Sequence, residues 1–179
     1  MTLANKLTLG RILLVPVFLA ACYVNIPFNM YIASCIFLAA ALLDLADGEV
    51  ARRMRQVTTF GRFIDPIADK MLVTAAILVL IERGSLHSLP AFIIVGREIL
   101  ISGFRLIALP EGVVISAGAL GKAKMVAQVV MSLVLLLDNY PFRLIGAPVD
   151  TLCVAAAVAL TVWSGWDYMY KNRALLSVR

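Results

Sequence analysis

Long apolar segments follow one another along this 179-residue chain, and they limit its possible folds more than any other feature. A helix needs about 20 apolar residues to cross a hydrocarbon core of roughly 30 Å, and several segments approach that length. Hydrophobic residues make up 62% of the sequence and charged residues only 15%, too little polar surface for a water-soluble globule. The mean hydropathy is +0.95. The sequence therefore predicts an all-α integral membrane protein.

Turn residues and changes in polarity divide the chain into six expected transmembrane helices, preceded by a short N-terminal interfacial helix. The interfacial helix is expected at residues 1–11, and the spans at 12–24, 30–43, 60–81, 90–109, 122–138 and 149–168. The unbroken apolar part of the second span is short, so its helix must begin in the interface or carry Asp44 and Asp47 at membrane depth. No internal repeat is present, which indicates one domain over residues 1–179.

Basic residues predict the orientation of the spans. Six spans place both termini on the same side, and of the 16 Lys and Arg residues all but Arg83 and Arg143 fall on that side. By the positive-inside rule, the side that carries both termini is cytoplasmic. The net charge of +5 is thus concentrated on one face, which suits anionic headgroups and phosphorylated substrates. Nothing in the sequence points to nucleic acid as a partner.

Four carboxylates lie at the cytoplasmic boundary between the second and third spans, namely Asp44, Asp47, Asp65 and Asp69. On a helix, residues three or four apart share a face, so each pair of acids projects from one side of its helix. Two helices joined by a short connection bring both pairs together, and four converging anions need a cation to offset their repulsion. Oxygen ligands without His or Cys indicate a hard ion, Mg²⁺, Mn²⁺ or Ca²⁺.

Small and basic residues accompany these acids. Gly48 and Gly61 have no Cβ, which allows a ligand or a second backbone to come close, and Arg52 supplies counter-charge for a phosphate. The complete pattern is Asp44-x2-Asp47-Gly48-x2-Ala51-Arg52-x8-Gly61-x3-Asp65-x3-Asp69. It resembles the signature of the CDP-alcohol phosphatidyltransferase family at every fixed position. The alternative, a solvated edge of Asp and Arg residues that only sets topology, does not account for the whole pattern.

This resemblance implies a fold, an activity and a set of roles. It implies a six-helix membrane enzyme, usually a homodimer, that holds one or two divalent cations, Mg²⁺ or Mn²⁺, against the diphosphate of a CDP-linked lipid. Asp44, Asp47 and Asp65 are then metal ligands, while Asp69 shares a metal and acts as the general base. The nucleotide site is implied to contain Gly48, Ala51, Arg52 and Gly61.

The identity of the acceptor substrate has to be inferred from residues outside the motif. Residues 3–18, 96–105 and 120–125 resemble the bacterial branch of the family that uses sn-glycerol 3-phosphate. A cationic set on the cytoplasmic side fits a phosphorylated acceptor, and it consists of Arg97, Arg105, Lys122 and Lys124. An amino-alcohol acceptor would call for aromatic or acidic residues instead. The alternative for Lys122 and Lys124 is that they extend to lipid headgroups and set topology.

Further polar residues receive predicted roles. Asn5, Thr8 and Arg11 lie near one helical face and are expected to reach substrate phosphate, with Asn5 and Thr8 assigned to the CDP-lipid and Arg11 to the acceptor. Helix capping is the alternative for Thr8. Glu98 is expected to orient a neighbouring arginine or to bind the acceptor itself.

Together these patterns predict an enzyme of phospholipid synthesis in a bacterial inner or cytoplasmic membrane, with its active site facing the cytoplasm. The expected reaction transfers the phosphatidyl group of CDP-diacylglycerol to sn-glycerol 3-phosphate and releases CMP. Inositol phosphate, or phosphatidylglycerol in cardiolipin synthesis, are the alternative acceptors. A membrane cation transporter is the alternative from a different class, but arginines beside the acids would repel a passing cation. A scaffold protein leaves the acids unexplained.

Overall fold

The computed structural model describes the backbone of residues 3–54, 59–108 and 118–173, and the side chains of residues 9–43, 70–104 and 118–173. Every regular element in these ranges is helical, which confirms the all-α prediction. The elements are α1 (Leu3–Tyr23), α2 (Asn29–Met54), α3 (Thr59–Glu82), α4 (Ser88–Ala108), α5 (Ala119–Leu136), the 3-10 helix η2 (Phe142–Ile145) and α6 (Val149–Lys171).

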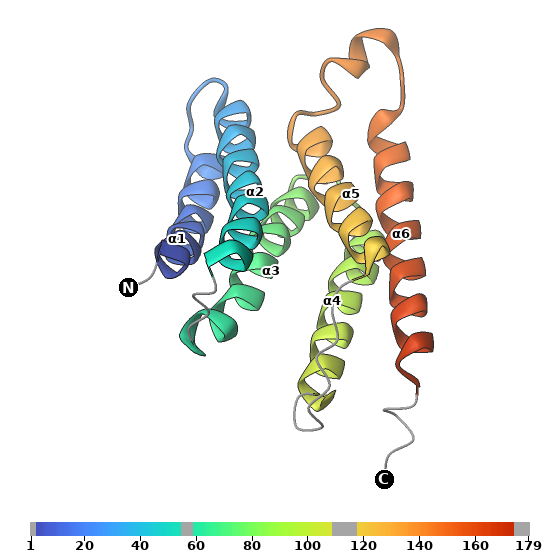
Figure 1. The fold of residues 1–179 in the computed structure, drawn as a ribbon. Coiled ribbons are helices and arrows are strands. Elements are labelled where there is room, and N and C mark those ends of the chain that lie inside the picture. Colours follow the sequence, from blue (N-terminus) through green and yellow to red (C-terminus); the bar gives the residue numbers. More distant parts are fainter. Residues whose placement is uncertain (1–2, 55–58, 109–117, 174–179) are drawn as a thin grey trace.

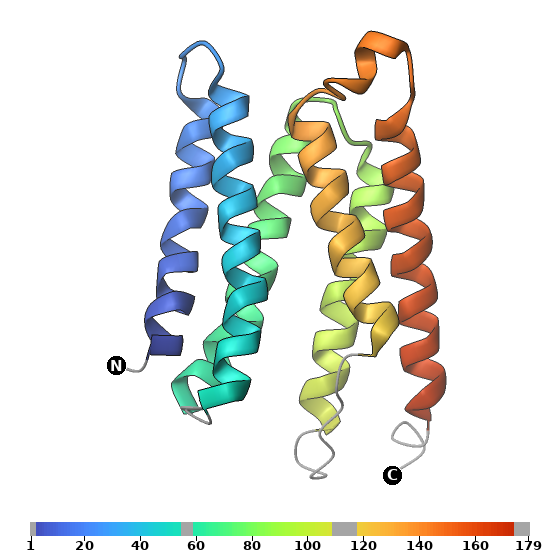
Figure 2. The same ribbon diagram turned by 45° about the horizontal axis from the view of Figure 1, so that its top comes forward.

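Successive α-helices alternate in direction and form a bundle, as Figures 1 and 2 show. One end of the bundle, the motif end, contains the first residues of α1 and α3 and the last residues of α2, α4 and α6. Contacts with α1, α2, α4 and α5 place α3 at the centre, whereas α6 packs against α4 and α5. The helix α3, which carries two of the four motif aspartates, therefore contacts α2, which carries the other two, and also α4 and α5, which carry the predicted acceptor cations at positions 97, 105, 122 and 124.

Two elements differ from the boundaries expected from the sequence. The helix α1 is continuous from Leu3 to Tyr23, so no break after Arg11 separates an interfacial helix from the first span. Gly10 and Pro16 are both accommodated inside the helix. The helix α2 runs on past the apolar residues to Met54, so it carries the positions of both Asp44 and Asp47.

Turn chemistry ends the helices opposite the motif end. Gly84 follows α3 with a φ of +71°, a left-handed conformation that glycine adopts without a Cβ penalty, and its amide donates to the Ile81 carbonyl at 2.9 Å. Before α2, the Asn29 side-chain amide donates to the Cys22 carbonyl at 3.1 Å and so closes the turn after α1. Both turns lie where breaker residues predicted them.

The core and the outer surface of the bundle are both apolar. Phe18 of α1 and Phe37 of α2 are fully buried, with ring centroids 5.7 Å apart, and they belong to one core cluster that also includes Ile77, Ile94 and Met131. The outer surface carries large exposed hydrophobic side chains, among them Phe92, Leu100, Trp163 and Trp166.

Lipid contact explains an outer surface of this kind, because a soluble protein rarely exposes so much contiguous apolar area. Among the described residues, α5 and α6 are long and apolar enough to cross a membrane. Shorter apolar helical stretches lie at Leu9–Tyr23 and Asn29–Leu43. The helical fold and its apolar outer surface are consistent with a membrane protein.

Candidate functional site

A cavity of about 160 Å³ lies between α3, α4 and α5. Charged side chains line it from all three helices, and they are Lys70, Arg97, Glu98, Lys122 and Lys124. Its apolar wall includes Val73, Ile77 and Ile94. Three of the predicted acceptor cations thus meet at one cavity, although they come from two different helices. With four basic groups and one acid among the lining residues that the structure describes, this part of the cavity favours an anion.

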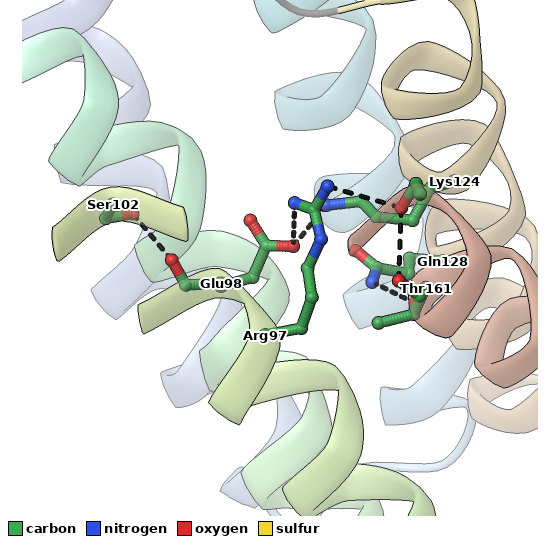
Figure 3. A network of polar contacts seen from close by, with 7 residues as sticks. Arg97, Glu98, Ser102, Lys124, Gln128 and Thr161 are labelled. Atoms are coloured by element: carbon green, nitrogen blue, oxygen red, sulfur yellow. Dashed lines mark hydrogen bonds and ion pairs between the residues drawn. The ribbon is translucent and has the colours of Figure 1, made fainter. Parts of the chain in front are cut away.

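Glu98 is the acid at the centre of this set. Its carboxylate accepts a hydrogen bond from Lys124 Nζ and another from Arg97 Nη1 at 3.3 Å, as Figure 3 shows. The Lys124 side chain is 8% exposed and the Glu98 side chain 20% exposed, so these charges sit largely out of solvent. Charge-assisted hydrogen bonds of this kind are about twice as strong as neutral ones and hold both cations in place. The expectation that Glu98 orients an arginine agrees with this contact.

The Arg97 guanidinium also reaches α6. Arg97 Nη2 donates to Ser164 Oγ at 3.2 Å, and Ser164 Oγ donates in turn to the Thr161 carbonyl at 3.1 Å. The Nε atom of Arg97 is buried and has no hydrogen-bond partner among the described residues. One arginine is therefore held between a carboxylate on its own helix and a hydroxyl on α6.

A second polar contact joins α5 to α6 beside the cavity. Gln128 Nε2, from a residue that lines the cavity, donates to Thr161 Oγ1 at 3.1 Å, and both side chains are buried (Figure 3). The sequence-based reasoning missed Gln128, Thr161 and Ser164. A signal was present, because Gln128 follows Lys124 by four residues and Ser164 follows Thr161 by three, so each pair shares a helical face.

For the other predicted site residues, the structure gives only the helix on which each one lies. Positions 44, 47, 48, 51 and 52 lie on α2, positions 61, 65 and 69 on α3, positions 5 and 8 on α1, and position 105 on α4. Their side chains, those of Asp44, Asp47, Gly48, Ala51, Arg52, Gly61, Asp65, Asp69, Asn5, Thr8 and Arg105, lie outside the described set. Arg11 is buried on α1 and is not among the described residues that line the cavity.

The acidic motif lies next to the cavity along the chain. The motif positions on α2 and α3 gather at the end of the bundle where α2 ends and α3 begins, and these two helices are in contact. Lys70 lines the cavity and directly follows Asp69, while Val73 follows Asp69 by one helical turn. Among the side chains that the structure describes, no three His, Cys, Asp or Glu residues gather as a metal site, and the motif aspartates are outside that set.

A helical bundle with an apolar outer surface and a cavity lined by basic groups from α3, α4 and α5 is consistent with a membrane protein that binds an anion. The model of the family described as CDP-alcohol phosphatidyltransferase matches residues 1–163. The chain belongs to the CDP-alcohol phosphatidyltransferase family, which confirms the resemblance predicted from the motif.

Curated relatives cover nearly the whole chain. A protein of Bacillus subtilis is 37% identical over 95% of this chain and 94% of its own length. A protein of Haemophilus influenzae is 37% identical over 91% of this chain and 89% of its own, and one of Rickettsia bellii is 32% identical over 93% and 92%. All three are named CDP-diacylglycerol–glycerol-3-phosphate 3-phosphatidyltransferase.

Proposed function

We propose that this protein transfers the phosphatidyl group of CDP-diacylglycerol to sn-glycerol 3-phosphate, giving phosphatidylglycerophosphate and CMP. The family and the names of its relatives support the reaction class. The observation that carries the choice of acceptor is the cavity between α3, α4 and α5, with its excess of basic groups. A phosphorylated acceptor supplies the anion that this excess favours, whereas an uncharged alcohol does not.

In this proposal the acceptor phosphate binds at the cavity, where Arg97 and Lys124 both contact the Glu98 carboxylate. Glu98 holds both cations at the wall of the cavity despite their mutual repulsion. Lys122 lines the same cavity. Arg105 on α4 and Arg11 on α1 are the further cations that we assign to the acceptor, Arg11 from a position outside the described cavity lining.

The donor binds at the motif end. Four carboxylates on two contacting helices, without His or Cys, are the donor set that a hard divalent cation prefers, so Asp44, Asp47, Asp65 and Asp69 would hold one or two Mg²⁺ or Mn²⁺ ions. Such an ion, when bound, offsets charge on the diphosphate and on the departing CMP. The nucleotide contacts are assigned to the small and basic motif residues and the start of α1, that is Gly48, Ala51, Arg52, Gly61, Asn5 and Thr8.

Asp69 takes the proton in the transfer step. The free primary hydroxyl of the acceptor attacks the phosphorus that carries the diacylglycerol, its proton passes to the Asp69 carboxylate, and the bond to the CMP oxygen breaks. Asp69 stands between the two sites along α3, because it belongs to the acidic motif and immediately precedes Lys70, which lines the cavity. This position suits a base that acts on the acceptor hydroxyl.

The proposal includes a membrane arrangement. The chain forms one domain over residues 1–179, with six transmembrane helices, both termini and the active site at the cytoplasmic face, and a homodimer as the assembly, in a bacterial inner or cytoplasmic membrane among its lipids. Alternating helix directions and the distribution of Lys and Arg support this orientation. Attachment of a reporter to the C-terminus tests it, because a cytoplasmic terminus activates only a reporter that works inside the cell.

A panel of acceptors tests the proposed reaction. Purified protein in detergent is incubated with CDP-diacylglycerol, Mg²⁺ or Mn²⁺ and one acceptor at a time, and the release of CMP is measured. We expect release with sn-glycerol 3-phosphate. Release only with inositol phosphate or with phosphatidylglycerol would instead assign one of the other family reactions.

A further inference from the structure

Gly165 of α6 lies against the side chain of Arg97. A Cβ atom added at position 165 would stand 3.2 Å from Arg97 Cγ and 3.7 Å from Arg97 Nε. The first distance is shorter than ordinary van der Waals contact between carbon atoms, about 3.5–4.0 Å, so the arginine would have to move. The stem of Arg97 therefore lies where a side chain at position 165 would otherwise be.

The residue before Gly165 holds the other end of the same arginine. Ser164 Oγ accepts a hydrogen bond from Arg97 Nη2 at 3.2 Å, and the Ser164 hydroxyl is oriented because it donates to the Thr161 carbonyl. Ser164 is 3% exposed, so water does not compete for this contact. Two adjacent residues of α6 thus determine where Arg97 lies, Gly165 by leaving room for the stem and Ser164 by binding the guanidinium.

Arg97 also separates two spaces in the structure. It lines the polar cavity between α3, α4 and α5, and it lines an apolar groove of about 730 Å³ between α4 and α6. The groove wall contains Leu100, Phe104 and Trp166 and offers the guanidinium no carboxylate among the described residues. A displacement of Arg97 toward the groove would therefore remove a cation from the cavity without giving it a new ionic partner.

We propose that Gly165 and Ser164 are positioning residues for the acceptor phosphate, acting through Arg97. The inference rests on the proposed function, in which Arg97 binds that phosphate. A Cβ at position 165 shifts the Arg97 stem by a few tenths of an ångström and so changes where its guanidinium lies at the cavity, and loss of the Ser164 hydroxyl removes one of the contacts that hold that guanidinium. Neither residue touches the substrate, so both changes weaken acceptor binding while leaving donor binding intact.

Gly165→Ala and Gly103→Ala form a matched pair for the test. Both glycines lie in helices and line the apolar groove, but a Cβ at Gly103 meets no atom of the described structure within 4 Å. The two substitutions raise helix propensity equally. We expect Gly165→Ala to raise KM for sn-glycerol 3-phosphate about tenfold, the factor that follows from the loss of one hydrogen bond to a charged group, with KM for CDP-diacylglycerol unchanged. Gly103→Ala should behave as the wild type.

A second pair of variants tests the Ser164 hydroxyl, and it remains informative if Gly165→Ala does not fold. Ser164→Ala removes the acceptor of the Arg97 hydrogen bond, and Ser164→Thr retains a hydroxyl. We expect the acceptor KM to rise in the alanine variant and to return toward the wild-type value in the threonine variant. A purely structural role would instead lower kcat or shift both KM values in all variants alike.

The outcomes separate this inference from the proposed function. If the wild type turns over sn-glycerol 3-phosphate and both Gly165→Ala and Ser164→Ala keep the wild-type KM for this acceptor, the positioning role is wrong and the proposed function stands. If the wild type does not use this acceptor, the proposed function is wrong, and inorganic phosphate serves as the probe of the cavity. A smaller thermal stabilisation by phosphate in Gly165→Ala than in Gly103→Ala would still support positioning, whereas equal stabilisation would overturn it.

Discussion

Replacement of Glu98 by glutamine removes the charge that Arg97 and Lys124 share while keeping the size of the side chain. The wild-type carboxylate accepts hydrogen bonds from both cations, and the three side chains are between 8% and 20% exposed. In Glu98→Gln, two positive groups stay close together in a largely buried cavity. We therefore expect the variant to be less stable than the wild type.

The size of the effect follows from the burial of the pair. Removing one partner of a fully buried ion pair costs about 3–5 kcal/mol, and a hydrogen bond to a charged group contributes about 1.5–3 kcal/mol. Glu98 is partly exposed and glutamine still accepts one hydrogen bond, which places the expected loss at about 2 kcal/mol. For a chain of this length, each kcal/mol lowers Tm by about 2–4 °C, so Tm should fall by about 4–8 °C.

Thermal unfolding in detergent measures this change, with Asp138→Asn as the control. Asp138 pairs with Arg143 at 3.1 Å, but both side chains are largely exposed, and such pairs contribute about 0–1 kcal/mol. Both substitutions remove one negative charge. Inorganic phosphate should stabilise Glu98→Gln more than the wild type, because the anion replaces the missing counter-charge. A Tm for Glu98→Gln no lower than that of the control would refute the reasoning.

Three further predictions follow from the same contacts and assignments. Gln128→Leu leaves the buried Thr161 hydroxyl without its donor and should cost about 1–2 kcal/mol, and pairing it with Thr161→Val should recover part of the loss in a double-mutant cycle. Asp69→Asn should still bind CDP-diacylglycerol in an equilibrium binding assay yet lose turnover, and full activity would reject the base assignment. Chelation of divalent cations should abolish CMP release and added Mg²⁺ or Mn²⁺ should restore it, whereas turnover that persists in chelator would contradict a metal-dependent mechanism.

Local sequence patterns predicted the helices and the family, because both depend on residues close together in the chain. Apolar runs and breaker residues predicted α2 to α6 to within a few residues at most ends outside the acidic motif. The exception was α1, where polar residues among leucines suggested a separate interfacial helix, whereas the helix continues through Gly10, Arg11 and Pro16. The spacing of the motif identified the family because its fixed positions reflect a chemistry of carboxylates and phosphate.

Contacts between helices were the part that the sequence did not reveal. Arg97, Lys122 and Lys124 were expected on one side of the membrane, but only the packing of α4 and α5 against α3 and α6 brings them to one cavity. The hydrogen bond between Gln128 and Thr161 depends on how α5 packs against α6, and the spacing of each residue along its own helix does not identify its partner on the other helix. The role of the cations in binding an acceptor stays a prediction.

The most direct test of the proposed reaction is the identity and amount of its lipid product. Purified protein is given CDP-diacylglycerol, sn-glycerol 3-phosphate and Mg²⁺ or Mn²⁺, and the lipid is analysed by mass spectrometry while CMP is quantified in the same sample. The account predicts phosphatidylglycerophosphate and CMP in equal molar amounts. Release of CMP without this lipid, or no reaction until another acceptor is supplied, would contradict it.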